Sequence, residues 1–78
     1  MTSDDLKQAR QMLGLNQREM SLLMGMPAPS YSRIETGDQG RKPTRQHANA
    51  VELLKYINMM APGGVRSCLQ LWEADAED

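Results

Sequence analysis

The side chains that could carry out chemistry in this 78-residue chain are few. The sequence holds one histidine, His47, and one cysteine, Cys68. A nucleophile, a general base and an orienting group cannot be assembled from this set, and two such ligands cannot complete a tetrahedral zinc site. We therefore predict a protein that is not an enzyme and has no catalytic residue, metal or cofactor. His47 is expected in the first turn of a helix, and Cys68 in the core.

Basic side chains are unevenly distributed along the chain. The net charge is −1, yet residues 7–45 hold seven basic and three acidic side chains, an excess of four positive charges. A polyanion responds to the local field rather than to the total charge, so this segment suits nucleic acid. Ordinary scattered surface charge is the alternative. The basic residues are Lys7, Arg10, Arg18, Arg33, Arg41, Lys42 and Arg45, while acidic residues gather at residues 4–5 and in an acidic tail at 73–78.

Helix-start and helix-stop signals predict five helices that must position these side chains. Ser, Thr or Asn stands as an N-cap before three of them, and glycine follows three of them, where a left-handed residue closes a helix. Proline is tolerated in a first turn, so one helix can begin near Pro27. The first predicted helix runs from Thr2 or Ser3 to Gly14, and the second from Asn16 to Gly25, with Glu19 completing a capping box. The third runs from near Pro27 to Gly37. The fourth runs from Thr44 to about Met60, and the last from Val65 to about Ala74.

The composition predicts one all-α domain. Apolar residues make up 40% of the chain, which suffices for one modest core, and no strand-like alternation is present. No stretch approaches the roughly 20 apolar residues of a membrane span, and the acidic start does not resemble a secretory signal. We expect a cytoplasmic protein. Residues 1–61 are expected to form the main functional unit, and residues 62–78 a short helix and acidic tail of the same domain.

The segment 17–37 carries a family resemblance. Its run QREMSLLMGMPAPSYSRIETG resembles the helix-turn-helix of the Xre/Cro family of phage and bacterial repressors, with Ser32-Arg33-Ile34-Glu35-Thr36-Gly37 as its most specific part. The resemblance extends from about Leu6 to Ile57. It implies a compact five-helix bundle of the lambda-repressor-like type, whose second and third helices form the helix-turn-helix. Ser21 would then be small because the two helices cross closely there.

The resemblance also implies which residues face DNA. The third helix would enter the major groove, with its N-terminal half at base edges. Gln17 resembles the family's phosphate-contacting glutamine, and the basic loop lies where the family meets the opposite backbone; a solvated loop is the alternative. Base contacts are expected from Ala28, Pro29, Ser30, Ser32 and Arg33, and phosphate contacts from Gln17, Arg18, Arg41, Lys42 and Arg45.

The sequence departs from the family pattern in two places, and one pair of residues has two interpretations. Ala28 stands where a glutamine often contacts adenine, so direct readout would rest on Ser30, Ser32 and Arg33, with DNA shape or a dimer supplying the rest. The family pairs Arg10 with Glu35 as an internal salt bridge, which we prefer to a phosphate contact by Arg10.

The second departure concerns apolar side chains. Leu22 and Leu23 occupy positions that are often polar in the family, which suggests that the last helix or a partner covers them. Residues 56–73 carry apolar side chains that a reading unit of about 50 residues does not need. We expect a homodimer interface there, and the alternative is that these side chains close the monomer's core. The expected interface residues are Tyr56, Met60, Leu69 and Trp72.

These features predict a sequence-specific regulator that binds double-stranded DNA as a homodimer, at a palindromic operator, and represses a small operon. It would act in the bacterial nucleoid or in the host cell of a phage. An antitoxin that binds a toxin and represses its own promoter is the first alternative. A protein-interaction module that has lost DNA binding is the second; the acidic tail and the two leucines favour it, and the basic loop and Gln17 oppose it.

Overall fold

The computed structural model describes the backbone of residues 1–76 and the side chains of residues 1–73. The rest of the predicted acidic tail lies outside the described residues. Within them the chain is all-helical, as predicted, and no helix there is both long and apolar enough to cross a membrane. The elements are α1 (Ser3–Met12), α2 (Gln17–Leu23), α3 (Ala28–Thr36), the 3-10 turn η1 (Asp38–Gly40), α4 (Arg45–Met60) and α5 (Gly64–Ala76).

Local capping sets where α1 and α2 begin. The Thr2 hydroxyl accepts from the Asp5 backbone N–H (3.1 Å), and the Asp5 carboxylate accepts from the Thr2 N–H (3.0 Å). Asn16 and Glu19 make the same reciprocal pair at 2.8 and 3.0 Å. Each capping box satisfies two backbone donors that a helix end would otherwise leave unpaired. Both boxes lie at the predicted caps.

The start of α4 uses a histidine in place of the usual glutamate. The Thr44 hydroxyl accepts from the His47 backbone N–H (3.3 Å), and His47 Nδ1 accepts from the Thr44 N–H (3.0 Å). The expected cap at Thr44 and first-turn place of His47 are therefore confirmed. The imidazole stands in for the carboxylate because its unprotonated nitrogen can also accept a backbone hydrogen bond.

The third helix begins and ends as its sequence predicted, but the loop after it is more ordered. Pro27 is the N-cap of α3 and Pro29 lies in the first turn, while Gly37 closes the helix with a φ of 74°. The segment 38–43, predicted only as a loop, holds η1, in which Gln39 has a φ of 55°. A non-glycine residue in this left-handed region is uncommon, and it turns the chain sharply toward α4.

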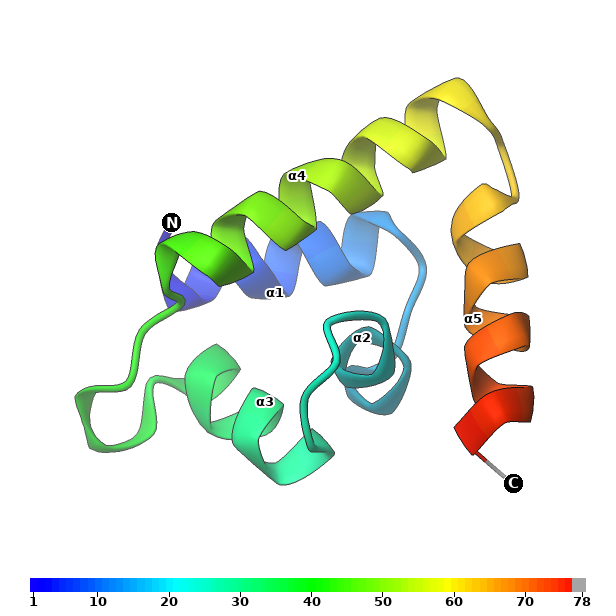
Figure 1. The fold of residues 1–78 in the computed structure, drawn as a ribbon. Coiled ribbons are helices and arrows are strands. Elements are labelled where there is room, and N and C mark those ends of the chain that lie inside the picture. Colours follow the sequence, from blue (N-terminus) through cyan, green and yellow to red (C-terminus); the bar gives the residue numbers. More distant parts are fainter. Residues whose placement is uncertain (77–78) are drawn as a thin grey trace.

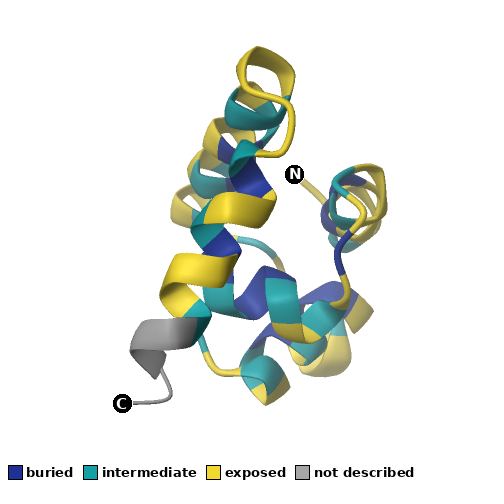
Figure 2. Cartoon of the chain, turned by 90° about the vertical axis from the view of Figure 1, so that its right-hand side faces the viewer, coloured by how far each residue is buried: buried dark blue, intermediate teal, exposed yellow. Residues whose placement is uncertain are grey.

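The core lies where the five helices converge. Figure 1 shows α1 and α4 running side by side, with α2 and α3 beneath them and α5 descending from the end of α4. Buried residues come from every helix, as the burial colours of Figure 2 show. No phenylalanine is available, so one tyrosine, leucines and a methionine fill the centre. The fully buried large side chains are Leu6, Met20, Tyr31, Val51 and Leu69.

The last helix packs against α2 and completes the core. Leu23 is buried and Leu22 half-buried against the cluster that contains Val65 and Leu69, and α5 packs on α2, in agreement with cover by the last helix. Leu69 is only 1% exposed. The expectation that it lines a dimer interface is therefore wrong, because its side chain is already buried within its own chain. Cys68 is half-buried at the edge of the same cluster, not fully inside it as expected.

Candidate nucleic-acid interface

The contact between α2 and α3 holds the two helices of the motif together. Met20 and Tyr31 are fully buried, one from each helix, and Ile34 is 7% exposed. Ser21 is 3% exposed, and its hydroxyl donates to the Arg18 carbonyl at 2.7 Å. A small residue whose polar group is satisfied within its own helix leaves room for the neighbouring helix. This is the role that the sequence predicted for Ser21.

The outer side of α3 is open to solvent. Pro29 and Arg33 are exposed, and Ala28, Ser30 and Ser32 are half-buried, while the opposite side of the helix is buried. All five expected base-contacting residues thus have accessible side chains. Thr36 shares this exposed side, but its hydroxyl donates to the carbonyls of Ser32 (3.0 Å) and Arg33 (3.3 Å).

Arg33 is the side chain of α3 best suited to a polyanion. Its guanidinium makes no ion pair with any side chain of residues 1–73, and it stands exposed. Five N–H donors in a fixed fork match either a phosphate or the O6 and N7 acceptors of guanine. The structure therefore leaves both modes of contact open to it.

Arg10 and Glu35 form an internal ion pair that joins α1 to α3. Arg10 Nε and Nη2 each donate to one Glu35 oxygen at 2.9 Å, and Nη1 donates to the Leu15 carbonyl at 2.9 Å. The side chains are only 13% and 2% exposed, respectively. This geometry confirms the structural alternative for Arg10, because its guanidinium is occupied within the fold.

The surroundings of this pair keep it charged. Burial by itself raises the pKa of Glu35, but hydrogen bonds, led by those from Arg10, outweigh it and hold the pKa below its ordinary value. The hydrogen bonds to Glu35 raise the pKa of Arg10. The buried Tyr31 hydroxyl has no hydrogen-bond partner among the described residues, and burial raises the pKa of this phenol. Arg10 and Glu35 therefore form an internal ion pair that carries no net charge.

Gln17 is turned partly toward the protein. Its amide Nε2 donates to Glu35 Oε1 at 3.3 Å, so one of its donors is used inside the fold. It lines a shallow groove together with Lys7 and Arg10. Its expected phosphate contact remains a prediction that rests on its second amide hydrogen and on the backbone N–H groups of the α2 terminus. Lys7 had been counted only as a charge; it lines this groove together with the acidic Asp4.

Arg18 has a partner that the sequence did not predict. Its Nη1 lies 3.2 Å from Glu73 Oε1 of α5, although the Arg18 side chain is 73% exposed. Two turns earlier in α5, Arg66 pairs with Glu19 and donates to the Gly14 carbonyl at 3.1 Å. Hydrogen bonding from the Asn16 backbone, aided by Arg66, lowers the pKa of Glu19. Two ion pairs thus tie α5 to the N-terminal end of α2.

The three remaining cations that are expected to contact phosphates lie beyond the C-terminal end of α3. Arg41 and Lys42 are exposed in the loop between η1 and α4, and Arg45 is exposed in the first turn of α4. Figure 1 shows this loop at one end of α3, with α2 beside its other end. Gln17, at the N-terminal end of α2, contacts Glu35 near the C-terminal end of α3, so this helix end lies toward the same end of α3 as the loop cations. Within residues 1–73 no group of three or more His, Cys, Asp or Glu side chains could hold a metal ion.

The comparison with known protein families agrees with this arrangement. A helix-turn-helix family model matches residues 6–54, more than half of the chain. The match spans α1 to most of α4 and excludes α5. No curated protein and no solved structure matches the chain.

Proposed function

Because the chain belongs to the helix-turn-helix family of Xre/Cro-type regulators, we propose that it is a dimeric repressor of a small operon. The family and the lambda-repressor-like fold place it among DNA-binding regulators. We further propose that it binds a palindromic operator in double-stranded DNA, including that of its own promoter.

The observation that carries this proposal is the exposed side of α3, with positive charge beyond its C-terminal end. Arg33 is exposed and unpaired among residues 1–73, and the nearby cations of the loop have exposed side chains. The ion pair between Arg10 and Glu35 fixes α3 to α1 without using the guanidinium of Arg33 or the cations of the loop. A rigid helix with free donors beside a basic loop suits insertion into the major groove.

The residues divide into contacts that position the protein and contacts that discriminate between bases. Arg41, Lys42 and Arg45, with the N-terminal end of α2 at Gln17 and Arg18, are proposed to meet phosphates. Ala28, Pro29, Ser30, Ser32 and Arg33 are proposed to face base edges. Only three of these five have polar side chains, so Ala28 and Pro29 would offer apolar contact to a thymine methyl. DNA shape and the second subunit would supply further discrimination.

A binding measurement on the chain's own upstream DNA tests the proposal. We expect the purified protein to bind a duplex from its upstream region at least a hundredfold more tightly than a scrambled duplex at the same salt concentration, because specific protein–DNA complexes exceed non-specific ones by about 10³ or more. Fluorescence anisotropy with labelled duplexes gives both affinities. Equal affinities for the two duplexes would refute a sequence-specific regulator.

An antitoxin that also represses its own promoter is the second candidate. The exposed apolar side chains of α4 and α5 favour it, since a toxin could cover them. Co-expression with the product of the neighbouring gene, followed by co-purification, distinguishes the two: a stable complex of unlike chains supports the antitoxin.

A further inference from the structure

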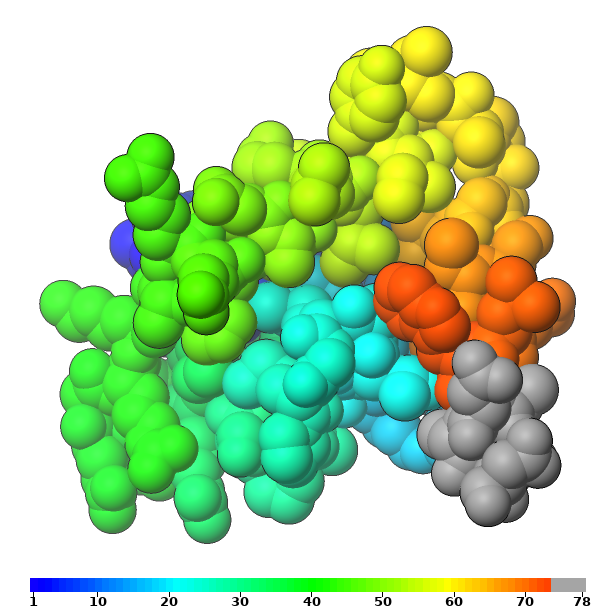
Figure 3. All heavy atoms as spheres, viewed as in Figure 1, coloured from blue at the N-terminus to red at the C-terminus, as the bar shows by residue number. Residues whose placement is uncertain are grey.

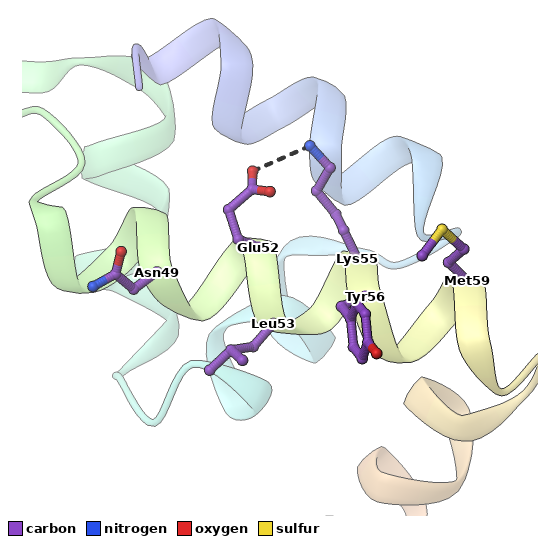
Figure 4. A pocket seen from close by; sticks show the side chains of 6 residues that line it. All are labelled: Asn49, Glu52, Leu53, Lys55, Tyr56 and Met59. Carbon is purple, nitrogen blue, oxygen red and sulfur yellow. Dashed lines mark hydrogen bonds and ion pairs between the residues drawn. The ribbon is translucent and has the colours of Figure 1, made fainter.

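The outer face of α4 is apolar, and none of the side chains of residues 1–73 covers it. Leu53, Tyr56 and Met60 are 65%, 58% and 62% exposed, respectively. Together with Asn49 they are spaced by four, three and four residues, which is the spacing of a helix face that packs against another helix. Figure 4 shows Leu53 and Tyr56 projecting side by side from α4, with Asn49 one turn earlier.

The apolar surface continues beyond this row. Met59 is 68% exposed and borders the same shallow hollow as Leu53 and Tyr56, and Trp72 of α5 is 43% exposed. Figure 3 shows the end of α4 and the neighbouring part of α5 on one face of the molecule. We call the surface formed by Asn49, Leu53, Tyr56, Met59, Met60 and Trp72 the α4 patch.

The size of the α4 patch matches what a stable dimer requires. Its five large side chains expose roughly 600 Å² of surface, at the upper end of the largest patch on a typical monomer. A standard interface buries about 800 Å² per partner, of which the core is mostly apolar. The α4 patch with a narrow polar rim would therefore fill one side of such an interface.

The charge of the α4 patch and its surroundings favours a second copy of the chain over a charged partner. Glu52 and Lys55 lie beside the patch and pair with each other at 3.2 Å, as the dashed line in Figure 4 marks. The patch consequently presents no uncompensated charge for an acidic or basic partner to complement. Two identical neutral surfaces can approach each other without like-charge repulsion or burial of an unpaired ion.

We propose that two copies of the chain associate through the α4 patch across a two-fold axis, with α4 packed against α4 of the second copy. In such an isologous contact each copy supplies both the projecting side chains and the hollow that receives them. This inference deepens the proposed homodimer by naming its surface, which differs from the sequence-based expectation by gaining Asn49, Leu53 and Met59 and losing Leu69. It rests on exposure, area and charge, and not on DNA binding.

Two leucines of nearly equal exposure provide a matched test. Leu53 is 65% exposed in the α4 patch, and Leu71 is 68% exposed on α5 outside the patch. Sedimentation of the full chain at tens of micromolar should show a dimer. We expect Leu53→Asp to weaken dimerisation by about a hundredfold or more, because the two-fold axis places the change in the interface twice. Leu71→Asp should leave the dimer intact.

The outcomes separate this inference from the proposed function. Circular dichroism of Leu53→Asp checks that the monomer remains helical, and Leu53→Ala, which adds no charge, should weaken the dimer in the same direction. A parent chain that is monomeric, or that dimerises equally well with Leu53→Asp, overturns the inference even if the chain binds DNA. A dimer lost with Leu53→Asp supports it even if no DNA binds. A complex that forms only with an unlike chain also overturns it.

Discussion

At the scale of single residues, the pair Arg10–Glu35 connects α1 to α3, the helix that is proposed to face DNA. Removing Arg10 leaves a carboxylate whose side chain is 2% exposed without its main donor. We expect Arg10→Ala to destabilise the fold by on the order of 3 kcal/mol, as for other buried pairs that lose one partner. Urea unfolding measures this loss, with Lys7→Ala as a control that removes a neighbouring exposed charge. A variant as stable as the parent that binds DNA weakly would instead make Arg10 a phosphate contact.

Arg33 and Lys42 test the division between discriminating and positioning contacts. Arg33→Ala should cost about 1–3 kcal/mol on the operator and much less on scrambled DNA, if the guanidinium contacts a guanine. Lys42→Ala should weaken binding to the operator and to scrambled DNA alike. It should also reduce the slope of log affinity against log salt concentration by about 0.9, because one fewer phosphate is neutralised. Salt titrations of both variants on both duplexes decide this. Equal losses for Arg33→Ala on the two duplexes would make Arg33 a backbone contact.

At the scale of elements, α5 acts on α2 through charge as well as through apolar packing. Glu73 lies 3.2 Å from Arg18, one of the proposed phosphate contacts. A carboxylate at this place competes with a phosphate for the same guanidinium. We expect Glu73→Gln to raise DNA affinity about twofold to fivefold at low salt, a modest effect because the pair is exposed and screened.

Glu52→Gln is the control for this prediction. It removes the same charge from an exposed glutamate on α4, away from α2. If both variants raise affinity equally, the effect comes from net charge alone, and α5 does not compete with DNA at Arg18. Anisotropy titrations at two salt concentrations separate these cases, since the specific effect should fade at high salt.

At the scale of the whole molecule, the same buried pair predicts how folding depends on pH. The pKa of Glu35 in the fold lies below its ordinary value of 4.5. A lowered pKa contributes stability above the unfolded value, and this contribution is lost as pH falls through the folded value. The free energy of unfolding should therefore decline below about pH 4.5, and less steeply in Glu35→Gln. Urea titrations between pH 3 and 7 measure it, with Glu52→Gln as control; equal slopes in all three proteins would contradict this role of Glu35.

Much of the helical framework could be predicted from the sequence, because helix ends are decided by nearby residues. Caps such as Asn16 bond to backbone groups three residues away, and a glycine such as Gly37 adopts a left-handed φ that few other residues tolerate. The motif of residues 17–37 likewise predicted which side of α3 is exposed, since its buried and exposed positions alternate with the helix period. The turn at Gln39 escaped prediction because no local signal there demands a left-handed residue.

What the tertiary structure decided was which surfaces of the last two helices are used within the chain. Leu69, Leu71 and Trp72 lie close together in an apolar segment, and periodicity alone does not say which of them faces α2. Packing buries Leu69 and leaves Trp72 partly exposed. The partners of Arg18 and Glu19 lie 55 and 47 residues away, so no local pattern could pair them. The sequence by itself determined where the helices are and which one is proposed to meet DNA. Only the packing of α5 against α2 determined which apolar side chains of α5 are buried and which stay exposed, because burial depends on neighbours that are distant in the chain.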